Sequence, residues 1–451
     1  MTRFDIGIDG YNLALPNGTG VATYGHVLTD ILRDGGHCVT GLFGVDAGRD
    51  PDMRELLFYD RMGHVPPTPT LRRKRRRRIL RAALRPFHVR HLDDVPHTGR
   101  IETANLAERL PAFDRLTTSP DLFEVAHRHF ALYGRFLRVR MDAPPAIMHW
   151  TYPLPIRLEG AANVHTFHDL VPLRLPYTTL DAKRAYRRLL AACAAEAAHI
   201  CTVSEASRAD IIAEFGLDPA SITNCYQASP LPAPDSDPQG DARIIENIFG
   251  LRHRGYFLHF GAIEPKKNIG RLLEAYLATG VEAPLVLTGG RGWQAQDELR
   301  LLVPDDEADT AHGRRMAERV RRLEHLPRAL LARLIRGARA VLFPSIHEGF
   351  GLPVLEAMQL GTPVLTSAVG APAEIAGDAA LLVDPYDVAA IAAGISALDS
   401  DAGLRDRMAA AGAAAAARFS APAYRTRLEQ MYARVLDAPL RAVTSSRRGR
   451  N

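Results

Sequence analysis

Short apolar runs alternate with longer amphipathic runs through the first half of the chain. The short runs are rich in β-branched and aromatic residues, as buried strands are, and the longer runs have helical periodicity. One helix is expected to begin after Ser204, a good N-cap residue, and to end near Gly216. This alternation is typical of βαβ units on a parallel sheet. The clearest strand candidates are residues 4–9, 38–44, 163–169 and 200–204.

A second alternation begins near residue 256 and predicts a second doubly wound unit. Between the two units, "SPLPAPDSDPQG" (229–240) is rich in Pro, Asp and Ser, which indicates an interdomain linker. The second unit is expected to contain strands 256–261, 284–288, 340–344, 363–366 and 380–383, and helices 268–278, 327–337 and 353–360.

The fold class is therefore α/β, with two Rossmann-like domains. The first domain is expected at 1–230, with a basic insert at about 60–145, and the second at 241–420. A further amphipathic helix at 421–441 is expected to pack back on the first domain. The tail 442–451 is expected to be disordered.

Composition narrows the class of protein without changing the fold prediction. The 451 residues are 47% hydrophobic and 24% charged, which is ordinary for a globular protein. Four scattered cysteines without a C-x-x-C pair indicate free thiols in a reducing compartment and disfavour a structural zinc site. The N-terminus does not resemble a signal peptide, and we expect a cytoplasmic protein without a membrane span.

The net charge of +5 is small, but the positive charge is unevenly placed. "LRRKRRRRILRAALRPF" (71–87) allows a basic amphipathic helix. Through Arg72–Arg78 it could bind an anionic membrane surface, each basic side chain contributing about 1 kcal/mol, or it could be a solvated helix. No nucleic-acid module surrounds the run, so nucleic acid is not an expected partner.

A dinucleotide-binding oxidoreductase is one rival for the Rossmann-like halves. "NGTGVATY" contains Gly18 and Gly20, but Thr23 occupies the third glycine position, and no acidic residue ends the next strand. The fingerprint therefore fails. A glycine loop before a helix still suits an anionic ligand, although a plain tight turn is an equal alternative.

Two lysines follow a predicted strand in "FGAIEPKKNIGRLLEAY". Lys266 and Lys267 precede Asn268, the expected N-cap of the next helix, at the end of the sheet where α/β proteins bind ligands. Two ammonium groups there can neutralise a diphosphate, but a lone pair of lysines can also be a solvated loop. The D-x-D at residues 235–237 lies in the linker rather than after a strand, so we expect no metal site there.

"HEGFGLPVLEA" (347–357) contains two glutamates around a glycine turn. Pro353 fits the first helical position, which places Glu356 in the first turn and Glu348 on the preceding loop. The two carboxylates are then on the order of 10 Å apart and not on one helical face. Glycosidase carboxylates flank one bond and usually come from different segments. This spacing better suits two carboxylates that bind different parts of one elongated ligand.

In combination, these motifs resemble the retaining GT-B glycosyltransferases of family 4, with "TFHDLVPLRLP" and "EPKKN" most similar to bacterial mannosyltransferases. The resemblance implies two Rossmann-like domains that face a central cleft, with the donor bound by the second. The matching segments are 166–176, 202–211, 261–276, 285–293, 343–367 and 376–387.

The resemblance assigns roles in donor binding. It implies that Glu348 binds the donor sugar and that Glu356 binds the ribose hydroxyls. Lys267, with Lys266 as the second choice, would neutralise the departing diphosphate. The backbone N–H groups that would reach the sugar and diphosphate belong to Phe350, Gly351 and Leu352.

The resemblance also assigns residues to the other side of the cleft. His168 matches a cleft histidine near the reacting sugar, and Asp169 would orient that ring or contact the acceptor. Gly18 and Gly20 match a glycine loop that faces the diphosphate and acceptor. Many relatives have a basic residue where this chain has Ala262, so Lys267 would carry more of the stabilisation.

The implied reaction is metal-independent, cofactor-free sugar transfer with retention at the anomeric carbon. The favoured donor is GDP-mannose, and the acceptor is a saccharide or a polyprenyl-diphosphate-linked saccharide in cell-surface polysaccharide synthesis, at the inner face of the membrane. Alternative donors are UDP-glucose, a UDP-linked amino sugar and dTDP-rhamnose. A nucleotide-sugar epimerase or hydrolase and a membrane-binding scaffold without catalysis are the alternatives of other classes.

Overall fold

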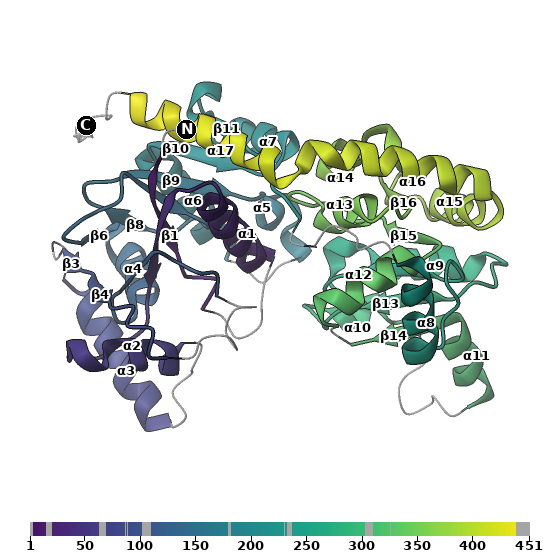
Figure 1. Cartoon of the computed structure of the whole chain (residues 1–451), viewed down its shortest axis with the longest axis horizontal. Helices are drawn as coiled ribbons and strands as arrows, with labels where there is room; N and C mark the ends of the chain where they lie inside the picture. Colours follow the sequence, from purple (N-terminus) through teal and green to yellow (C-terminus); the bar gives the residue numbers. More distant parts are fainter. Residues whose placement is uncertain are drawn as a thin grey trace.

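The protein consists of two α/β domains that lie side by side (Figure 1), as seen in a computed structural model. The N-terminal domain is purple to teal, and the C-terminal domain is mostly green. The predicted pair of doubly wound sheets is confirmed. The structure describes residues 3–14, 20–62, 69–85, 87, 89–101, 110–178, 182–229, 231, 237–302, 310–324 and 326–438.

The N-terminal domain is built on an eight-stranded sheet of order β11-β10-β9-β7-β1-β2-β5-β4. Its neighbouring strands are parallel, except that β4 runs antiparallel to β5 at one edge. The run β5-β2-β1-β7-β9-β10 has the order of a Rossmann sheet, with its switch point between β1 and β7. The strands are β1 Asp5–Asp9, β2 Cys38–Phe43, β4 Asp93–Val95, β5 Arg115–Thr118, β7 Ile147–Trp150, β9 Ala162–Phe167, β10 His199–Thr202 and β11 Ile222–Asn224.

The C-terminal domain is built on a six-stranded parallel sheet of order β14-β13-β12-β15-β16-β17. This is again the Rossmann order, with the switch point between β12 and β15. The four central strands are buried at every residue, as expected for a parallel sheet covered on both faces. The strands are β12 Phe257–Phe260, β13 Leu285–Thr288, β14 Val320–Leu323, β15 Ala340–Phe343, β16 Val364–Ser367 and β17 Leu381–Val383.

Helices connect the strands, and a small sheet, β3 Arg90–His91, β6 Leu137–Arg140 and β8 Ile156–Leu158, completes the N-terminal domain. The α-helices are α1 Gly20–Asp34, α2 Pro51–Arg61, α3 Pro69–Ala83, α4 Leu122–Tyr133, α5 Val171–Arg174, α6 Lys183–Glu196, α7 Glu205–Phe215, α8 Pro238–Phe249, α9 Ile269–Ala278, α10 Ala295–Glu298, α11 Ala311–Arg319, α12 Arg328–Gly337, α13 Leu352–Gln359, α14 Gly370–Ala376, α15 Val388–Ser400, α16 Ala402–Ala416 and α17 Ala421–Asp437.

Local predictions made from capping residues are confirmed at α7. The Ser204 hydroxyl accepts a hydrogen bond from the backbone N–H of Ser207, and Gly216 ends the helix in the left-handed region, with φ 61°. The four cysteines are free thiols, as predicted. In the part of the chain that the structure describes, no helix is both long and apolar enough to cross a bilayer.

Two predictions about domain limits need correction. Helix α8 begins at Pro238, so the linker predicted to reach residue 240 ends earlier; residues 230 and 232–236 of it lie outside the described residues. The insert predicted at 60–145 is too long, because β5 and α4 within that range belong to the main fold. The tail predicted at 442–451 lies outside the described residues.

The last helix, α17, leaves the C-terminal domain and lies against the N-terminal one (Figure 1, yellow). The Tyr432 hydroxyl lies 2.6 Å from Nδ1 of His149, and a Glu429 carboxylate oxygen lies 3.1 Å from Nε2 of His37. The Tyr432 ring also meets Phe4 edge-on. Helix α17 therefore completes the core of the N-terminal domain.

Replacing Tyr432, which is fully buried, should destabilise the protein through this domain. Tyr432→Ala removes a large side chain and the hydrogen bond to His149, and it should lower the free energy of unfolding by about 3–5 kcal/mol. Leu436→Ala, on the same helix at a side chain that is 43% exposed, should change it by only about 0.5 kcal/mol. Urea unfolding measures both; similar losses for the two variants would contradict the packing described.

Candidate functional site

Charged residues gather at the carboxyl end of the C-terminal sheet, on either side of its switch point. The short 3-10 turn Pro265–Lys267 follows β12 and carries both lysines, while the loop after β15 carries Glu348. Backbone hydrogen bonding ties the two loops, since the Ile346 N–H donates to the Lys266 carbonyl at 2.8 Å. Ligands of open α/β sheets bind at this position.

Lys267 and Glu348 form a buried ion pair. Lys267 Nζ donates to Glu348 Oε1 at 2.5 Å, and the Ser345 hydroxyl donates to the same oxygen at 3.0 Å. The Lys267 ammonium group also lies 4.8 Å from the centre of the Phe343 ring. Burial alone would raise the pKa of Glu348, but the charges of Lys267 and Lys266 hold that pKa below its ordinary value.

Lys266 links the two domains electrostatically. Burial opposes its charge, but the carboxylates of Glu348, Asp169 and Glu264 together raise the pKa of Lys266 above its ordinary value. Glu264 is 3.6 Å away, whereas Asp169 belongs to the N-terminal domain, after β9. Lys266 is therefore charged at neutral pH, next to the surface where the domains meet.

Gly349 brings the glutamate loop against the N-terminal domain. Its carbonyl accepts hydrogen bonds from the hydroxyls of Ser204 at 2.7 Å and Ser207 at 3.1 Å, at the start of α7. A Cβ atom at this position would lie only 2.7 Å from the His168 carbonyl oxygen and 3.0 Å from Asp169 Oδ2. Only glycine allows this approach, which places the predicted residues of both domains side by side.

A second contact, between α7 and α14, fixes the same interface. The Glu374 carboxylate accepts hydrogen bonds from the backbone N–H groups of Glu205 at 2.8 Å and Ala206 at 2.9 Å. A carboxylate at a helix N-terminus is favoured by both the unpaired N–H groups and the helix dipole. No sequence pattern predicted this contact, because its partners are far apart in the chain.

The turn between the two glutamates presents backbone donors. Gly351 has φ 103°, in the left-handed region, and directly precedes α13. No described residue accepts a hydrogen bond from the N–H groups of Phe350, Gly351 or Leu352. The Phe350 ring packs edge-on against Phe419, 5.8 Å between centroids. The three predicted donors are thus available at a helix N-terminus, which suits an anion.

Glu356 differs from its predicted position. Because α13 begins at Leu352, Glu356 lies in the second turn, and the prediction of a first-turn residue was wrong. Its side chain is buried, and no described group hydrogen-bonds its carboxylate. Burial raises the pKa of Glu356 to about 8, although Arg328 and Lys267 oppose the rise. Among the described residues, its carboxylate has no hydrogen-bond partner, as expected of a residue that binds ligand hydroxyls.

His168 is held as a neutral ring. Its Nε2 atom lies 2.8 Å from the Thr151 carbonyl oxygen, which requires the proton on Nε2 and leaves Nδ1 as an acceptor. Burial lowers the pKa of His168, and the Tyr24 ring meets it edge-on at 4.8 Å. Asp169 instead accepts from the Val171 N–H at 2.9 Å, so the predicted role of orienting the histidine belongs to Thr151.

Asp9 is a residue that the sequence analysis missed. It ends β1, is fully buried, and accepts from the Thr151 N–H at 2.5 Å and the Tyr11 N–H at 3.1 Å. Burial raises the pKa of Asp9 to about 6. Its carboxylate fixes the residue that orients His168. Its position at the end of a predicted strand, where α/β proteins place ligand-binding residues, could have identified it from the sequence.

The remaining predicted positions contribute less to this geometry. Gly18 lies outside the described residues, and Gly20 opens α1 with open space where a Cβ would be. Asp235 and Ser236 also lie outside them, while Asp237 caps α8 by accepting from the Gly240 N–H at 2.8 Å. Within the described ranges, no group of three or more His, Cys, Asp or Glu residues could hold a metal ion.

Comparisons with known proteins agree with this architecture. The family model of glycosyl transferases group 1 matches residues 244–415, and that of glycosyltransferase family 4 matches residues 106–226. O-antigen chain mannosyltransferase B of Escherichia coli is 38% identical over 274 residues, 59% of this chain and 68% of that protein.

Two further relatives are more distant. O-antigen chain mannosyltransferase RfbU of Salmonella typhimurium is 28% identical over 222 residues, 49% of this chain and 56% of that protein. The structure of HepE from Anabaena with UDP and glucose superposes with a TM-score of 0.62 at 15% identity, covering 96% of this chain and 100% of that one. This likeness over nearly both whole chains confirms the predicted GT-B fold.

The buried carboxyl of Glu356 should make stability depend on pH. Its pKa of about 8 lies above the 4.5 of an exposed glutamate, so the folded chain keeps a proton that the unfolded chain releases. The linked stability is complete below about pH 4.5 and is lost as the pH rises through 8. Relative to Glu356→Gln, the wild type should lose on the order of 5 kcal/mol over this range.

Urea unfolding of the two proteins at several pH values measures this difference. Glu348→Gln is the matched control, because the lowered pKa of Glu348 gives the opposite sign: the wild type should gain stability relative to that variant as the pH rises. A difference for Glu356→Gln that stays constant with pH would show that this carboxyl is ionised in the folded protein.

Proposed function

The chain belongs to the family of glycosyl transferases group 1, and we propose that it transfers a hexose from a nucleotide-sugar donor to a saccharide acceptor during cell-surface polysaccharide synthesis. The observation that carries the proposal is the Lys267–Glu348 pair at the switch point, facing His168 and Asp169 of the other domain. Mannose is the favoured sugar, because two of the relatives are named as O-antigen mannosyltransferases. The complex of HepE with UDP and glucose supports UDP-glucose as the alternative.

In this proposal the donor lies along the loop that follows β15. Lys267 and Lys266 neutralise the diphosphate, with the N–H groups at 350–352 donating to the same anion. Glu348 accepts from hydroxyls of the sugar, and Glu356 binds those of the ribose. Because lysines and backbone dipoles supply the positive charge, we propose that transfer needs neither a metal ion nor a cofactor.

Donor binding exchanges the partners of the buried ions. Without ligand, Lys267 and Glu348 neutralise each other, which avoids an unpaired buried charge. With ligand, the lysine gains phosphate oxygens and the glutamate gains sugar hydroxyls, so each ion stays paired throughout. The pair thus keeps the donor site charged and ordered between turnovers.

We propose that transfer proceeds with retention of configuration. The bond from the anomeric carbon to the phosphate oxygen breaks, and a bond to the acceptor hydroxyl oxygen forms on the same face of the sugar. The departing phosphate takes the proton of that hydroxyl. His168 contributes as a neutral ring, whose Nδ1 atom can accept a hydrogen bond from a substrate hydroxyl.

A panel of nucleotide sugars tests the proposed function. Purified protein should be protected against thermal unfolding by one nucleoside class and should slowly hydrolyse the matching donor, releasing nucleoside diphosphate and free sugar. An epimerase would instead convert one nucleotide sugar into another, and a scaffold would release nothing. Either result, or protection by no donor, would contradict the proposal.

Glu348→Gln tests the central residue. The amide keeps the shape of the side chain but removes the charge that pairs with Lys267, so donor turnover should fall by about 10²–10³ fold. Glu282→Gln, the same change at an exposed site of the same domain, should leave turnover within about twofold of the wild type. Unchanged turnover in folded Glu348→Gln protein would refute the role assigned to this carboxylate.

We also propose that the protein acts at the cytoplasmic face of the membrane, where a polyprenyl-diphosphate-linked acceptor would be found. The arginine run is not one uniform basic face, because Arg75 and Arg78 form ion pairs with Asp121, both at 2.6 Å. The exposed face instead combines Arg73 and Arg76 with apolar side chains, Leu80 at 44% and Leu84 at 52% exposure. Such a face suits an anionic bilayer surface.

Removing the two outer arginines should weaken membrane binding. At about 1 kcal/mol for each basic side chain, Arg73→Ser/Arg76→Ser should reduce binding to anionic vesicles by roughly 30-fold in a sedimentation assay. Arg243→Ser/Arg252→Ser, which removes two exposed arginines from the other domain, is the control and should bind as the wild type does. Equal binding by all three proteins would favour a solvated helix.

A further inference from the structure

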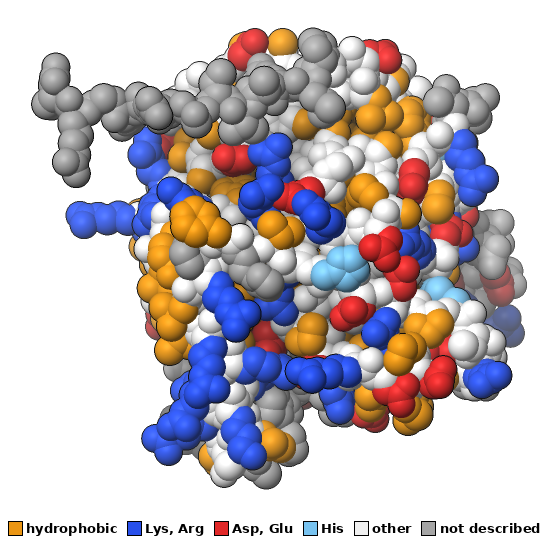
Figure 2. Space-filling view, turned by 90° about the vertical axis from the view of Figure 1, so that its left-hand side faces the viewer, with side chains coloured by type: hydrophobic (Ala, Val, Ile, Leu, Met, Phe, Trp, Pro, Cys, Tyr) orange, Lys and Arg blue, Asp and Glu red, His pale blue; other side chains and the backbone are white. Residues whose placement is uncertain are grey.

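A basic groove lies in the N-terminal domain, apart from the donor-binding residues. Its volume is about 750 Å³, and it is formed by one face of α3, the loop after β2 and the strand β3. Figure 2 shows Lys and Arg side chains crowded on the lower part of this side of the molecule. The basic residues that matter most are Arg49, Lys74, Arg77, Arg81, Arg85 and Arg90.

Carboxylates of the described residues balance only part of the charge in this groove. Arg78, also at its surface, is paired with Asp121 and Asp46, and Arg90 donates to the Ser119 hydroxyl at 3.0 Å and the Pro120 carbonyl at 2.8 Å. In the described part of the chain, the remaining basic residues of the groove have no carboxylate partner: Arg49, Lys74, Arg77, Arg81 and Arg85. An anionic ligand would supply the missing charge.

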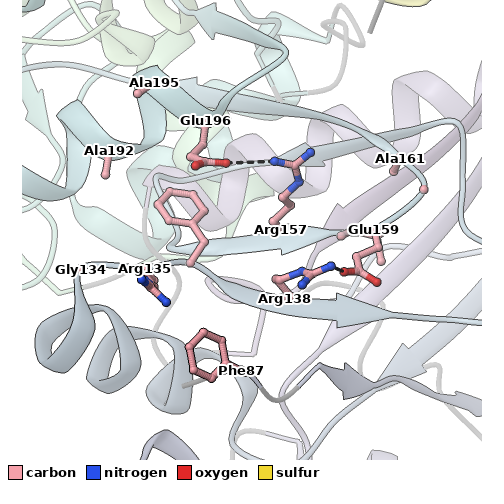
Figure 3. A pocket seen from close by; sticks show the side chains of 13 residues that line it. Phe87, Gly134, Arg135, Arg138, Arg157, Glu159, Ala161, Ala192, Ala195 and Glu196 are labelled. Carbon is pink, nitrogen blue, oxygen red and sulfur yellow. Dashed lines mark hydrogen bonds and ion pairs between the residues drawn. The ribbon is translucent and has the colours of Figure 1, made fainter. Parts of the chain in front are cut away.

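In a second cavity nearby, carboxylates of the protein pair with arginines. This cavity, of about 830 Å³, also contains arginines, but Arg157 is paired with Glu196 at 3.1 Å and Arg138 with Glu159 (Figure 3). Arg135 lies over the Phe87 ring, 5.5 Å from its centre. Its neighbour, the basic groove, differs in having cations without carboxylates, which points to a ligand rather than to structural ion pairing.

The groove lies on the same edge of the N-terminal sheet as the proposed reaction centre. Arg49 follows β2 and Ser119 follows β5, so both come after the carboxyl ends of parallel strands, as His168 does after β9. Three strand spacings separate β9 from β2, and four separate it from β5. At about 4.8 Å per spacing, the groove begins roughly 14–19 Å from the strand that carries His168.

We propose that this groove binds the diphosphate of the lipid-linked acceptor, with the saccharide extending along the sheet edge to the reaction centre. The inference rests on the proposed function and names a subsite for its acceptor. Guanidinium groups bind phosphate oxygens in a bidentate manner, and a diphosphate offers enough oxygens for several of them. Separate diphosphate sites for donor and acceptor would let both substrates bind together.

Pyrophosphate binding to the full-length protein tests the site directly. Isothermal titration is done with the donor site filled by the nucleoside diphosphate that protects best in the donor panel, or by GDP if none protects. Arg77→Gln/Arg81→Gln should weaken pyrophosphate binding at least tenfold. Arg73→Gln/Arg76→Gln removes the same charge from the same helix but outside the groove, and should change binding less than twofold. Arg49→Gln, in the loop after β2, should weaken binding without altering α3.

Three outcomes would overturn the inference. The first is that the wild type does not bind pyrophosphate, and the second is that both double variants weaken pyrophosphate binding equally. The third is that inorganic phosphate or phosphatidylglycerol vesicles displace pyrophosphate as well as a diphosphate does. The last would assign the groove to lipid headgroups. If groove-dependent pyrophosphate binding persists while no donor is turned over, the site stands and the proposed function fails.

Discussion

The buried Lys267–Glu348 ion pair is the constraint on which the rest of the site depends. Two charges removed from water are tolerated only when each has a close partner, and removing one partner leaves a costly unpaired ion. The pair forms because β12 and β15 are neighbours in the sheet, so the loops after them emerge together. Ser345 supplies the remaining hydrogen bond. The Rossmann order of the sheet thus creates the charged site directly.

The second domain is joined to this site by a few specific contacts. The Ser204 hydroxyl both caps the N-terminus of α7 and donates to the Gly349 carbonyl, so one side chain starts a helix and fixes the domain interface. The absence of a side chain at Gly349 lets His168 and Asp169 approach the glutamate loop. The residues of the candidate site come from two separate sheets, and these contacts set their spacing.

Much of the fold followed from local patterns, while long-range partners did not. Five strands of the C-terminal sheet were predicted within about one or two residues, because buried parallel strands are short, apolar and punctuated by glycine and proline. The edge strand β14, whose sequence VRRL carries two arginines, was missed. The grouping of Lys266, Lys267 and Glu348 was also predictable, since parallel strands end at one edge. The hydrogen-bonded link from Asp9 through Thr151 to His168 was not predictable, because β1 and β7 are distant in sequence. The sequence also does not distinguish Arg75 from the other arginines of its run, because its partner Asp121 is 46 positions away.

Helix α17 has a consequence for how the protein is made. The N-terminal domain is synthesised first, yet its core includes Tyr424 and Tyr432, which emerge from the ribosome only after the entire C-terminal domain. Domains usually fold in order as they are translated. Here the first domain must wait, with the apolar surface that α17 will cover still open to water. The order of translation and the order of completion are therefore reversed.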